Sequence, residues 1–230
     1  MTIYDLFDGL ARCAPGDADS VARACAGVAP GATVLDAGCG RGADLPALRA
    51  AIPGARIVAV DAAAPFIAHV AAAFPGVQAV CGDMAHPPGG PFGLIWSGGA
   101  IYNLGVTPAL QGWRAHLAPG GRVAFSDLVL RGLAAPEVAD FFAAEGVTLR
   151  DEAALRAEVA AAGFRVVETF WMPDRAWADY YLPLEPRLGA TEIAQDPDTR
   201  AFALAFRHEI DLWRRHGADY GYLVCVAVPE

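Results

Sequence analysis

The chain has 230 residues, and 17 basic side chains against 26 acidic ones give it a formal net charge of −9. All the basic side chains are Arg, because the sequence contains no Lys. The absence of Lys excludes Schiff-base chemistry, a P-loop and a Ser–Lys pair, and the negative charge disfavours binding of nucleic acid through phosphate contacts. No apolar run approaches the roughly 18 residues of a membrane-spanning helix, so we expect no membrane partner.

Two further features bear on the compartment. The N-terminal sequence MTIYDLFDGLARC carries acids where a signal peptide would carry basic residues. The five Cys residues are scattered and form no C-x-x-C pair, so we interpret them as buried thiols rather than disulfides or zinc ligands. We therefore expect a cytoplasmic protein without a metal site.

Short runs rich in Val and Ile alternate with Ala-rich stretches of helical period along most of the chain. This alternation is typical of parallel strands joined by crossover helices. The predicted strands are residues 33–37, 57–61, 77–81, 93–97, 122–127, 164–171 and 221–228. The pattern predicts an α/β fold with a mostly parallel seven-stranded sheet and helices on both faces.

The helices between these strands have recognisable starts and stops. Helices 43–51 and 65–74 each run into a Pro-Gly pair, which ends a helix. A third helix is predicted to begin with Thr107 as its N-cap and Pro108 as its first residue. Asp151 is predicted to begin a fourth helix, which runs into Gly163.

Residues 173–220 break the alternation and contain a helix with aromatic and Ile side chains on one side. We interpret this stretch as a helical insertion between the last two strands, after which the final strand enters most simply antiparallel to its neighbours. The chain is then one domain over residues 1–230. Its parts are an N-terminal helical lid (1–30), a ligand-binding core (31–172), the insertion as a second lid (173–220) and the final strand (221–230).

Residues 34–42 read VLDAGCGRG, so an acid ends the first strand and glycines follow at a spacing of two. Glycines at such a position let the backbone turn tightly and approach a ligand at the N-terminus of the next helix. The same residues also satisfy the dinucleotide-binding pattern G-x-G-x-x-G/A. The loop therefore predicts a nucleotide-like ligand without naming it.

Acids at three strand ends narrow the choice of ligand. Asp61 ends the second strand, where a carboxylate binds both hydroxyls of a ribose, and Asp83 follows the third, where a carboxylate accepts from an adenine amine. Asp36 would repel a pyrophosphate but attract a sulfonium or ammonium group. The three acids together favour an adenosine that carries a positive charge.

These residues resemble the class I S-adenosylmethionine-dependent methyltransferases. The resemblance covers about residues 1–228 and rests on VLDAGCGRG, the Asp61 of VAVD, the CGDM around Asp83, FGLIWSGGAIYNLG and LAPGGRVAFSD. It implies a Rossmann-like fold and S-adenosylmethionine as cofactor. The residues expected to bind the cofactor are Asp36, Gly38, Cys39, Gly40, Asp61, Ala62, Asp83, Met84 and Ser97. Among them, the resemblance places Gly38 to Gly40 at the methionine part, Asp61 at the ribose and Asp83 at the adenine.

Three later segments, WSGGAIYNLG, RAWADYYLPLEPR and HGADYGY, resemble a bacterial subgroup of methyltransferases that act on small molecules. In that subgroup the position of Gly98 is usually occupied by an acidic residue. This chain has no acidic side chain there, which argues against a catalytic role for the position. The resemblance carries no particular substrate.

Methyl transfer needs positioning and exclusion of water, and a general base is optional. Asp127, at the end of the fifth strand, is the candidate catalytic residue because open α/β sheets bind ligands beyond that edge. The candidate substrate-binding residues are Tyr4, Tyr102, Asp127, Trp177 and Tyr181. With Glu185 they suggest an aromatic, acidic pocket for an amine or cation.

The predicted reaction is therefore transfer of a methyl group from S-adenosylmethionine to nitrogen or oxygen of a small molecule, which releases S-adenosylhomocysteine. Two alternatives stay open at this point. An NAD-dependent oxidoreductase would use Gly38, Gly40, Ala43 and Asp61, and a non-catalytic module would keep only the nucleoside pocket. The sequence leaves the oligomeric state open.

Overall fold

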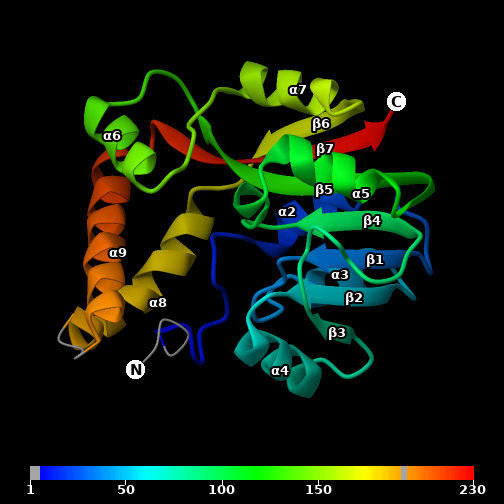
Figure 1. Ribbon diagram of the computed structural model, residues 1–230, viewed down its shortest axis with the longest axis horizontal. Helices are drawn as coiled ribbons and strands as arrows, with labels where there is room; N and C mark the ends of the chain where they lie inside the picture. Colours follow the sequence, from blue (N-terminus) through cyan, green and yellow to red (C-terminus); the bar gives the residue numbers. More distant parts are fainter. Residues whose placement is uncertain (1–5, 193–195) are drawn as a thin grey trace.

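The computed structural model describes residues 6–192 and 196–230, apart from the side chains of residues 190–192. Its strands are β1 (Thr33–Ala37), β2 (Arg56–Asp61), β3 (Gln78–Cys81), β4 (Phe92–Ser97), β5 (Leu117–Leu130), β6 (Phe164–Trp171) and β7 (Tyr220–Pro229). They form one sheet in the order β3-β2-β1-β4-β5-β7-β6 (Figure 1). Strand β7 pairs antiparallel with β5 and β6, and the remaining neighbours pair in parallel. The predicted seven-stranded sheet with an antiparallel last strand is confirmed.

The helices alternate with the strands along the first part of the chain and cluster near its end. They are α2 (Ala18–Ala24), α3 (Leu45–Ala51), α4 (Ala64–Ala73), the 3-10 turn η1 (Ile101–Asn103), α5 (Val106–Arg114), α6 (Pro136–Ala144), α7 (Glu152–Ala161), α8 (Arg175–Glu192) and α9 (Pro197–His216). Helix α2 lies within the predicted N-terminal helical part (1–30), although the sequence analysis did not give its bounds, and α6 was not predicted. Both are short, and the apolar period of a short helix is hard to distinguish from that of a loop.

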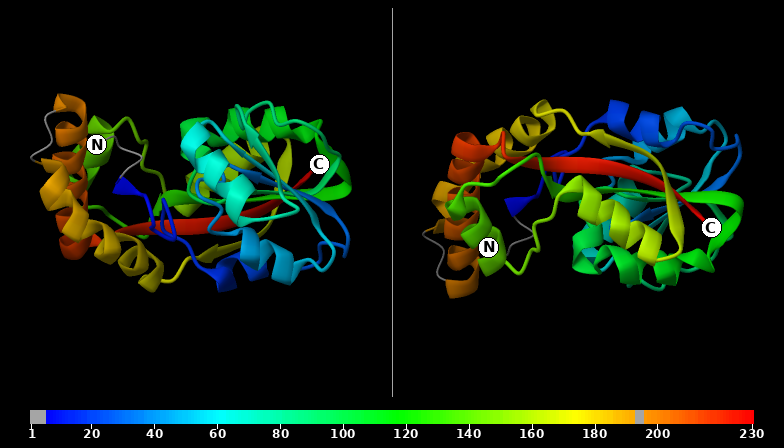
Figure 2. Two further views of the ribbon diagram at one scale, coloured as in Figure 1. Left: turned by 90° about the horizontal axis from the view of Figure 1, so that it is seen from below. Right: turned by 90° about the horizontal axis from the view of Figure 1, so that it is seen from above.

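Alternate residues of the buried strands point to opposite faces of the sheet. Val34 and Ile57 belong to a hydrophobic cluster with residues of α2, α3 and α4, whereas Leu35 and Val58 belong to a second cluster with residues of α5 and α7. Helices therefore cover both faces, as the sequence predicts (Figure 2).

Helices α6, α8 and α9 lie beyond the carboxyl-terminal ends of the parallel strands, at the left of Figure 1. Helices α8 and α9 are the predicted insertion between β6 and β7, and they pack against each other. Phe206 and Ile210 of α9 are buried, and Phe202 and Trp213 are half-buried on the same side. We call α6, α8 and α9 the helical cap.

The predicted start of α5 is wrong. Thr107 does not cap this helix; Gly105 is its N-cap, with φ = 81°, and Thr107 lies in the first turn. Gly105 adopts the positive φ that ends η1 and starts α5 within one residue, which few other residues could do. Pro108 is tolerated because the first N–H groups of a helix have no partner inside it. Asp151, by contrast, caps α7 as predicted and accepts from the N–H of Ala154 at 2.8 Å.

Within residues 6–192 and 196–230, no helix combines the length and the apolar character that crossing a membrane requires.

Replacing Trp113 with Ala should lower the free energy of unfolding by about 3–5 kcal/mol, because it opens a cavity and removes a hydrogen bond. Trp113 is fully buried on α5, and its Nε1 donates to the carbonyl oxygen of Met84 at 2.7 Å. Urea unfolding measures the change. Leu133→Ala is the control, because Leu133 is 98% exposed and its loss should change stability by less than about 0.5 kcal/mol. Equal effects of the two substitutions would contradict this account of the core.

Candidate functional site

The glycine loop after β1 forms one wall of a cleft at the carboxyl-terminal edge of the sheet. The N–H groups of Gly38 and Cys39 donate to the carbonyl oxygen of Val60, at 2.9 and 3.0 Å, which fastens the loop to the end of β2. Gly38 has φ = 76°, and a Cβ built on it would lie 2.4 Å from the Cβ of Ala100. A side chain at this position would therefore collide with the opposite wall, so the loop requires glycine here.

Two carboxylates lie at the ends of β1 and β2 beside this loop. Asp61 accepts from the N–H of Gly40 and from the N–H of Ala63, each at 2.8 Å. Asp36 is 2% exposed, and its Oδ2 has no hydrogen-bond partner. Burial, followed by the nearby charges of Asp44 and Asp61, raises the pKa of Asp36 well above its usual value. A buried, unpartnered carboxyl group of this kind fits a ligand that brings a positive charge or a hydrogen-bond donor.

The N-terminal segment forms the opposite side of the cleft. The guanidinium of Arg12 pairs with Asp44 at 2.7 Å, and the Nε1 of Trp96 donates to the other oxygen of Asp44 at 2.8 Å. Arg41 of the glycine loop pairs with Asp8 at 3.2 Å. These contacts hold residues 8–16 against the edge of the sheet. The cleft between the two walls has a volume of about 220 Å³.

Gly98 makes the position of Asp44 possible. A Cβ built on Gly98 would lie 2.6 Å from Oδ2 of Asp44 and 3.0 Å from Nε1 of Trp96. The carboxylate of Asp44 therefore occupies the space into which a side chain at position 98 would project. The cleft contains an acid at this point although residue 98 supplies none.

The structure brings together only some of the residues predicted to bind the cofactor. Those that line the cleft are Asp36, Gly38, Cys39, Gly40 and Asp61. Those outside its lining are Ala62, Asp83, Met84 and Ser97.

These four residues have other surroundings. The side chain of Asp83 is 59% exposed and accepts from the N–H of Ala85 and from His86. Ser97 is fully buried and donates to the carbonyl oxygen of Ala37 at 2.9 Å. The sulfur of Met84 would lie 3.1 Å from a Cβ on Gly38, so Met84 lies beside Ala100 on the side to which that Cβ would point. Ala62 is exposed, and its carbonyl oxygen accepts from the thiol of Cys81.

A second cavity, of about 260 Å³, lies between the cleft and the helical cap. Its walls carry aromatic side chains from five segments of the chain: Tyr102, Phe141, Phe142, Trp177, Tyr180, Phe202, Phe206 and Tyr222. The ring centroids of Trp177 and Tyr222 are 4.9 Å apart, and those of Tyr180 and Phe206 are 6.0 Å apart. We call this space the aromatic cavity. It shares Cys13, Ala14, Pro15, Gly99 and Tyr102 with the lining of the cleft.

The predicted substrate residues are divided between this cavity and its surroundings. Tyr102 and Trp177 line the aromatic cavity. Tyr181 does not line it: the neighbouring Tyr180 does, and Tyr181 is 1% exposed behind the wall. Tyr4 lies outside the described residues.

Asp127 and Glu185 lie outside the aromatic cavity. Asp127 lines an adjoining hollow, where it forms an ion pair with Arg150 and accepts from the N–H of Leu128 at 2.9 Å. Burial raises the pKa of Asp127 to about 6, against the opposing charge of Arg150. Glu185 is paired with Arg214 on the outer side of the cap at 2.6 Å, so its predicted place in an acidic pocket is wrong.

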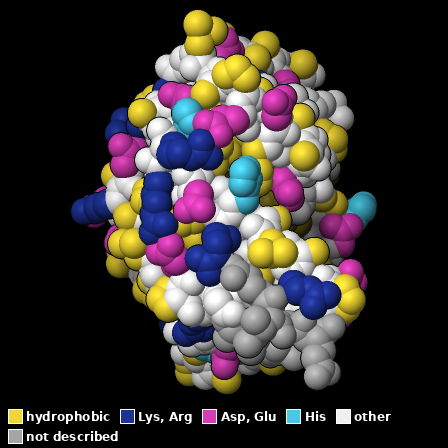
Figure 3. Space-filling view, turned by 90° about the vertical axis from the view of Figure 1, so that its left-hand side faces the viewer, with side chains coloured by type: hydrophobic (Ala, Val, Ile, Leu, Met, Phe, Trp, Pro, Cys, Tyr) yellow, Lys and Arg dark blue, Asp and Glu magenta, His cyan; other side chains and the backbone are white. Residues whose placement is uncertain are grey.

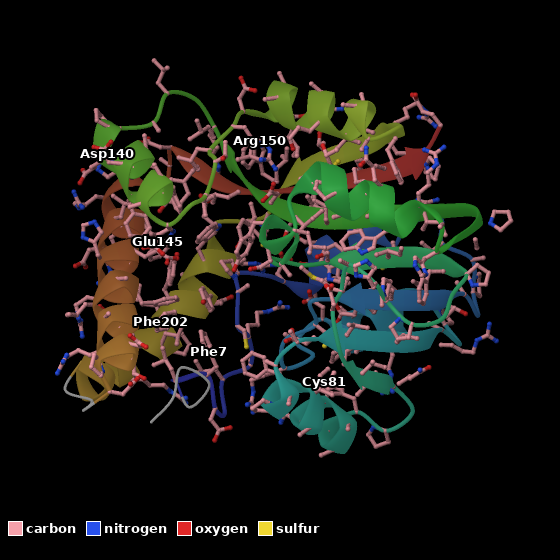
Figure 4. All side chains as sticks on the ribbon, in the orientation of Figure 1. Phe7, Cys81, Asp140, Glu145, Arg150 and Phe202 are labelled. Atoms are coloured by element: carbon pink, nitrogen blue, oxygen red, sulfur yellow. The ribbon has the colours of Figure 1, made fainter. Side chains whose placement is uncertain are left out.

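Two acids line the aromatic cavity, and the more buried of them is Glu209 of α9, which the sequence analysis did not identify. It is half-buried, and Tyr181 Oη donates to its Oε1 at 2.5 Å. Burial raises the pKa of Glu209 to about 7, although the bond from Tyr181 acts in the opposite direction. Its spacing of three residues from Phe206 and seven from Phe202 places it on the same side of the helix and was the available signal. The second acid, Glu145 at the end of α6, is exposed and also lines the cavity (Figure 4).

No group of three His, Cys or acidic residues suited to a metal ion occurs within the described part of the chain.

Residues 3–169 match a family model described as a methyltransferase domain. The chain belongs to this family. The match confirms the methyltransferase family that the sequence motifs predict. A search among curated proteins finds no significant match to the chain.

Solved structures show how widely this fold is used. The methyltransferase is similar to a SAM-dependent methyltransferase from Geobacter sulfurreducens crystallised with S-adenosylhomocysteine (20% identity, TM-score 0.77, 98% of this chain and 96% of that one). It is also similar to a phosphoethanolamine N-methyltransferase from Haemonchus contortus (17%, 0.70, 98% and 56%) and to a geranyl diphosphate C-methyltransferase from Streptomyces coelicolor (16%, 0.65, 93% and 78%). The structural similarity establishes the Rossmann-like fold, and at these low identities it establishes the fold alone. Enzymes with this fold methylate nitrogen and carbon, so the acceptor atom must be argued from the cavity.

Glu209→Gln should stabilise the methyltransferase more at high pH than at low pH. A carboxyl group with a raised pKa in the folded state binds its proton more tightly there than in the unfolded chain. Its contribution to stability therefore falls as the pH rises from about 4.5 to about 7. Relative to wild type, the variant should gain up to about 2–3 kcal/mol in the free energy of unfolding across this range.

Urea unfolding at pH 5 and pH 8 measures this difference. Asp140→Asn is the control, because it removes an exposed carboxylate on the outer side of α6 (Figure 4). Asp127 also titrates in this range, but it is present in all three proteins. A pH-independent effect of Glu209→Gln would contradict the raised pKa.

Proposed function

We propose that the methyltransferase transfers a methyl group from S-adenosylmethionine to a nitrogen or oxygen atom of a small molecule, an amine or cation, in the aromatic cavity. S-adenosylhomocysteine is then released from the cleft. The observation that carries this proposal is the wall shared by the two spaces. Because Cys13, Gly99 and Tyr102 line both, a group held in the cleft faces a group held in the cavity.

The cleft suits the methionine part of the cofactor in two respects. The glycine loop lets backbone approach the ligand, and the unpartnered Oδ2 of Asp36 offers an acceptor to an ammonium or sulfonium charge. Gly38, Cys39 and Gly40 would hold the methionine part beside Asp36.

Asp61 would bind the ribose hydroxyls. Each of its oxygens already accepts one backbone N–H, and an ionised carboxylate has further lone pairs for two hydroxyl donors. Asp83 would accept from the exocyclic amine of the adenine, for which its side chain must turn from His86. Ala62, Met84 and Ser97 are the other predicted cofactor residues, and of these Ser97 is fully buried and bonded to the carbonyl oxygen of Ala37, so it would act through the backbone of the loop.

When bound, the cofactor would supply a methyl group carried by a positively charged sulfur. The acceptor atom forms a bond to the methyl carbon in line with the breaking carbon–sulfur bond, and the neutral sulfur is the leaving group. The chain has to align the acceptor with that methyl group and keep water away. The buried rings of Trp177, Tyr180 and Tyr222 exclude water from the cavity, and the pairing of Arg12 with Asp44 holds the shared wall in place. Asp127 lies in the adjoining hollow and is the candidate to meet a polar group of the substrate or to accept a proton.

Isothermal calorimetry with S-adenosylhomocysteine, and with NAD as the comparison ligand, tests the cofactor. We expect S-adenosylhomocysteine alone to bind. Asp61→Ala should weaken its binding by about 1.5–3 kcal/mol, since charged hydrogen bonds to the ribose and to the loop are both lost. Asp140→Asn removes one negative charge far from the cleft and should leave the affinity unchanged. Binding of NAD alone would overturn the proposed function, and wild-type affinity in Asp61→Ala would remove Asp61 from the site.

A further inference from the structure

One face of α9 carries a single acid among apolar side chains. Phe202, Phe206 and Glu209 recur at intervals of four and three residues, so they project from the same side of the helix. All three line the aromatic cavity. A carboxylate in this position would weaken the packing of the helix unless something in the cavity interacts with it.

The chain supplies only part of that interaction. Tyr181 Oη donates one hydrogen bond to Oε1 of Glu209, at 2.5 Å. Among the described residues, no Arg or His forms an ion pair with Glu209.

Other acids near the cap do have cationic partners on its outer face. Arg214 pairs with Glu185 and Arg215 with Glu137, and basic and acidic side chains are interspersed there (Figure 3). Arg214 and Arg215 thus pair with acids on the outside of the cap and leave Glu209, inside it, without a cationic partner among the described residues.

The remaining lining of the cavity favours positive charge. No Arg or His is among its described lining residues, and Glu145 adds a second carboxylate. Aromatic faces attract organic cations through their quadrupoles, most strongly where water is excluded. Tyr102 lines both spaces, and Tyr222 lies close to Gly99 of the shared wall, so these two rings connect this environment to the cleft.

We propose that Glu209, positioned by Tyr181, is the specificity-determining residue that binds the ammonium group of an amine substrate within the aromatic cavity. This inference rests on the proposed function for the identity of the reaction, but the binding of the ammonium group can be measured without it. The raised pKa of Glu209 agrees with a site that lacks its counter-charge until the substrate arrives. Carboxylate and phosphate compounds are excluded, because they would meet two acids and no basic side chain.

Calorimetric titration of the full chain with matched organic probes tests the assignment. The probes are phenethylamine, benzyltrimethylammonium, phenethyl alcohol and hydrocinnamate, which share a ring and differ in charge. At pH 8 both cationic probes should bind at least about tenfold more tightly than the alcohol, and hydrocinnamate should not bind. Equal affinity for the alcohol, preference for hydrocinnamate, or no binding of either cation at millimolar concentration would overturn the proposal. This comparison uses the wild-type protein and does not depend on any variant.

Glu209→Gln should lower the affinity for both cations by about tenfold or more and leave the affinity for phenethyl alcohol within about twofold. Asp140→Asn removes the same charge from the outer side of α6 and should change neither. Retention of wild-type cation affinity in Glu209→Gln would overturn the role of this residue.

Titration of the same proteins with S-adenosylhomocysteine separates the two proposals. Selective cation binding without binding of S-adenosylhomocysteine would refute the proposed function and leave this inference standing. Binding of S-adenosylhomocysteine without selectivity for cations would refute this inference alone.

Discussion

The strand order reverses at β1, and the position of the site depends on this reversal. Strands β2 and β3 follow on one side and β4 and β5 on the other. The loops that leave β1 and β4 therefore diverge, and a crevice opens between them at the carboxyl-terminal edge. The glycine loop, Asp36 and Asp61 surround this crevice, and the N-terminal segment covers it. Each wall of the cleft belongs to a different connection, so the cleft exists only in the folded sheet.

The sequence predicts the central part of the fold well because the signals there are local. The strands up to β4, the glycine loop and the cap at Asp151 are each specified by a few neighbouring residues. The predicted start of α5 is wrong because a local signal there is misleading. Thr107 and Pro108 carry a strong capping signal, but the positive φ of Gly105 places the start of the helix two residues earlier.

The candidate site was only partly predictable, because its second half is assembled from distant segments. Tyr102 follows β4, Trp177 lies on α8 and Glu209 on α9, and only the packing of the cap brings them to one cavity. The sequence does not show which acidic side chain forms an ion pair with which Arg. The arginines decide which acids are neutralised, so Glu185 was assigned to the pocket although Arg214 holds it outside. The same packing buries Tyr181 behind the cavity wall and places Tyr180 in the lining. These two residues are adjacent in the sequence, and the apolar pattern of α8 does not show which of them faces the cavity.

The contact between Gly98 and Asp44 limits what position 98 can carry. A side chain at position 98 and a carboxylate at position 44 compete for one volume, since they would approach within 2.6 Å. An acid placed at position 98 would therefore displace Asp44 from Trp96 and loosen the pairing with Arg12 that closes the cleft. In this structure the acid at this point of the cleft therefore comes from the start of α3 and not from the loop after β4, and the space at position 98 is part of what holds it there.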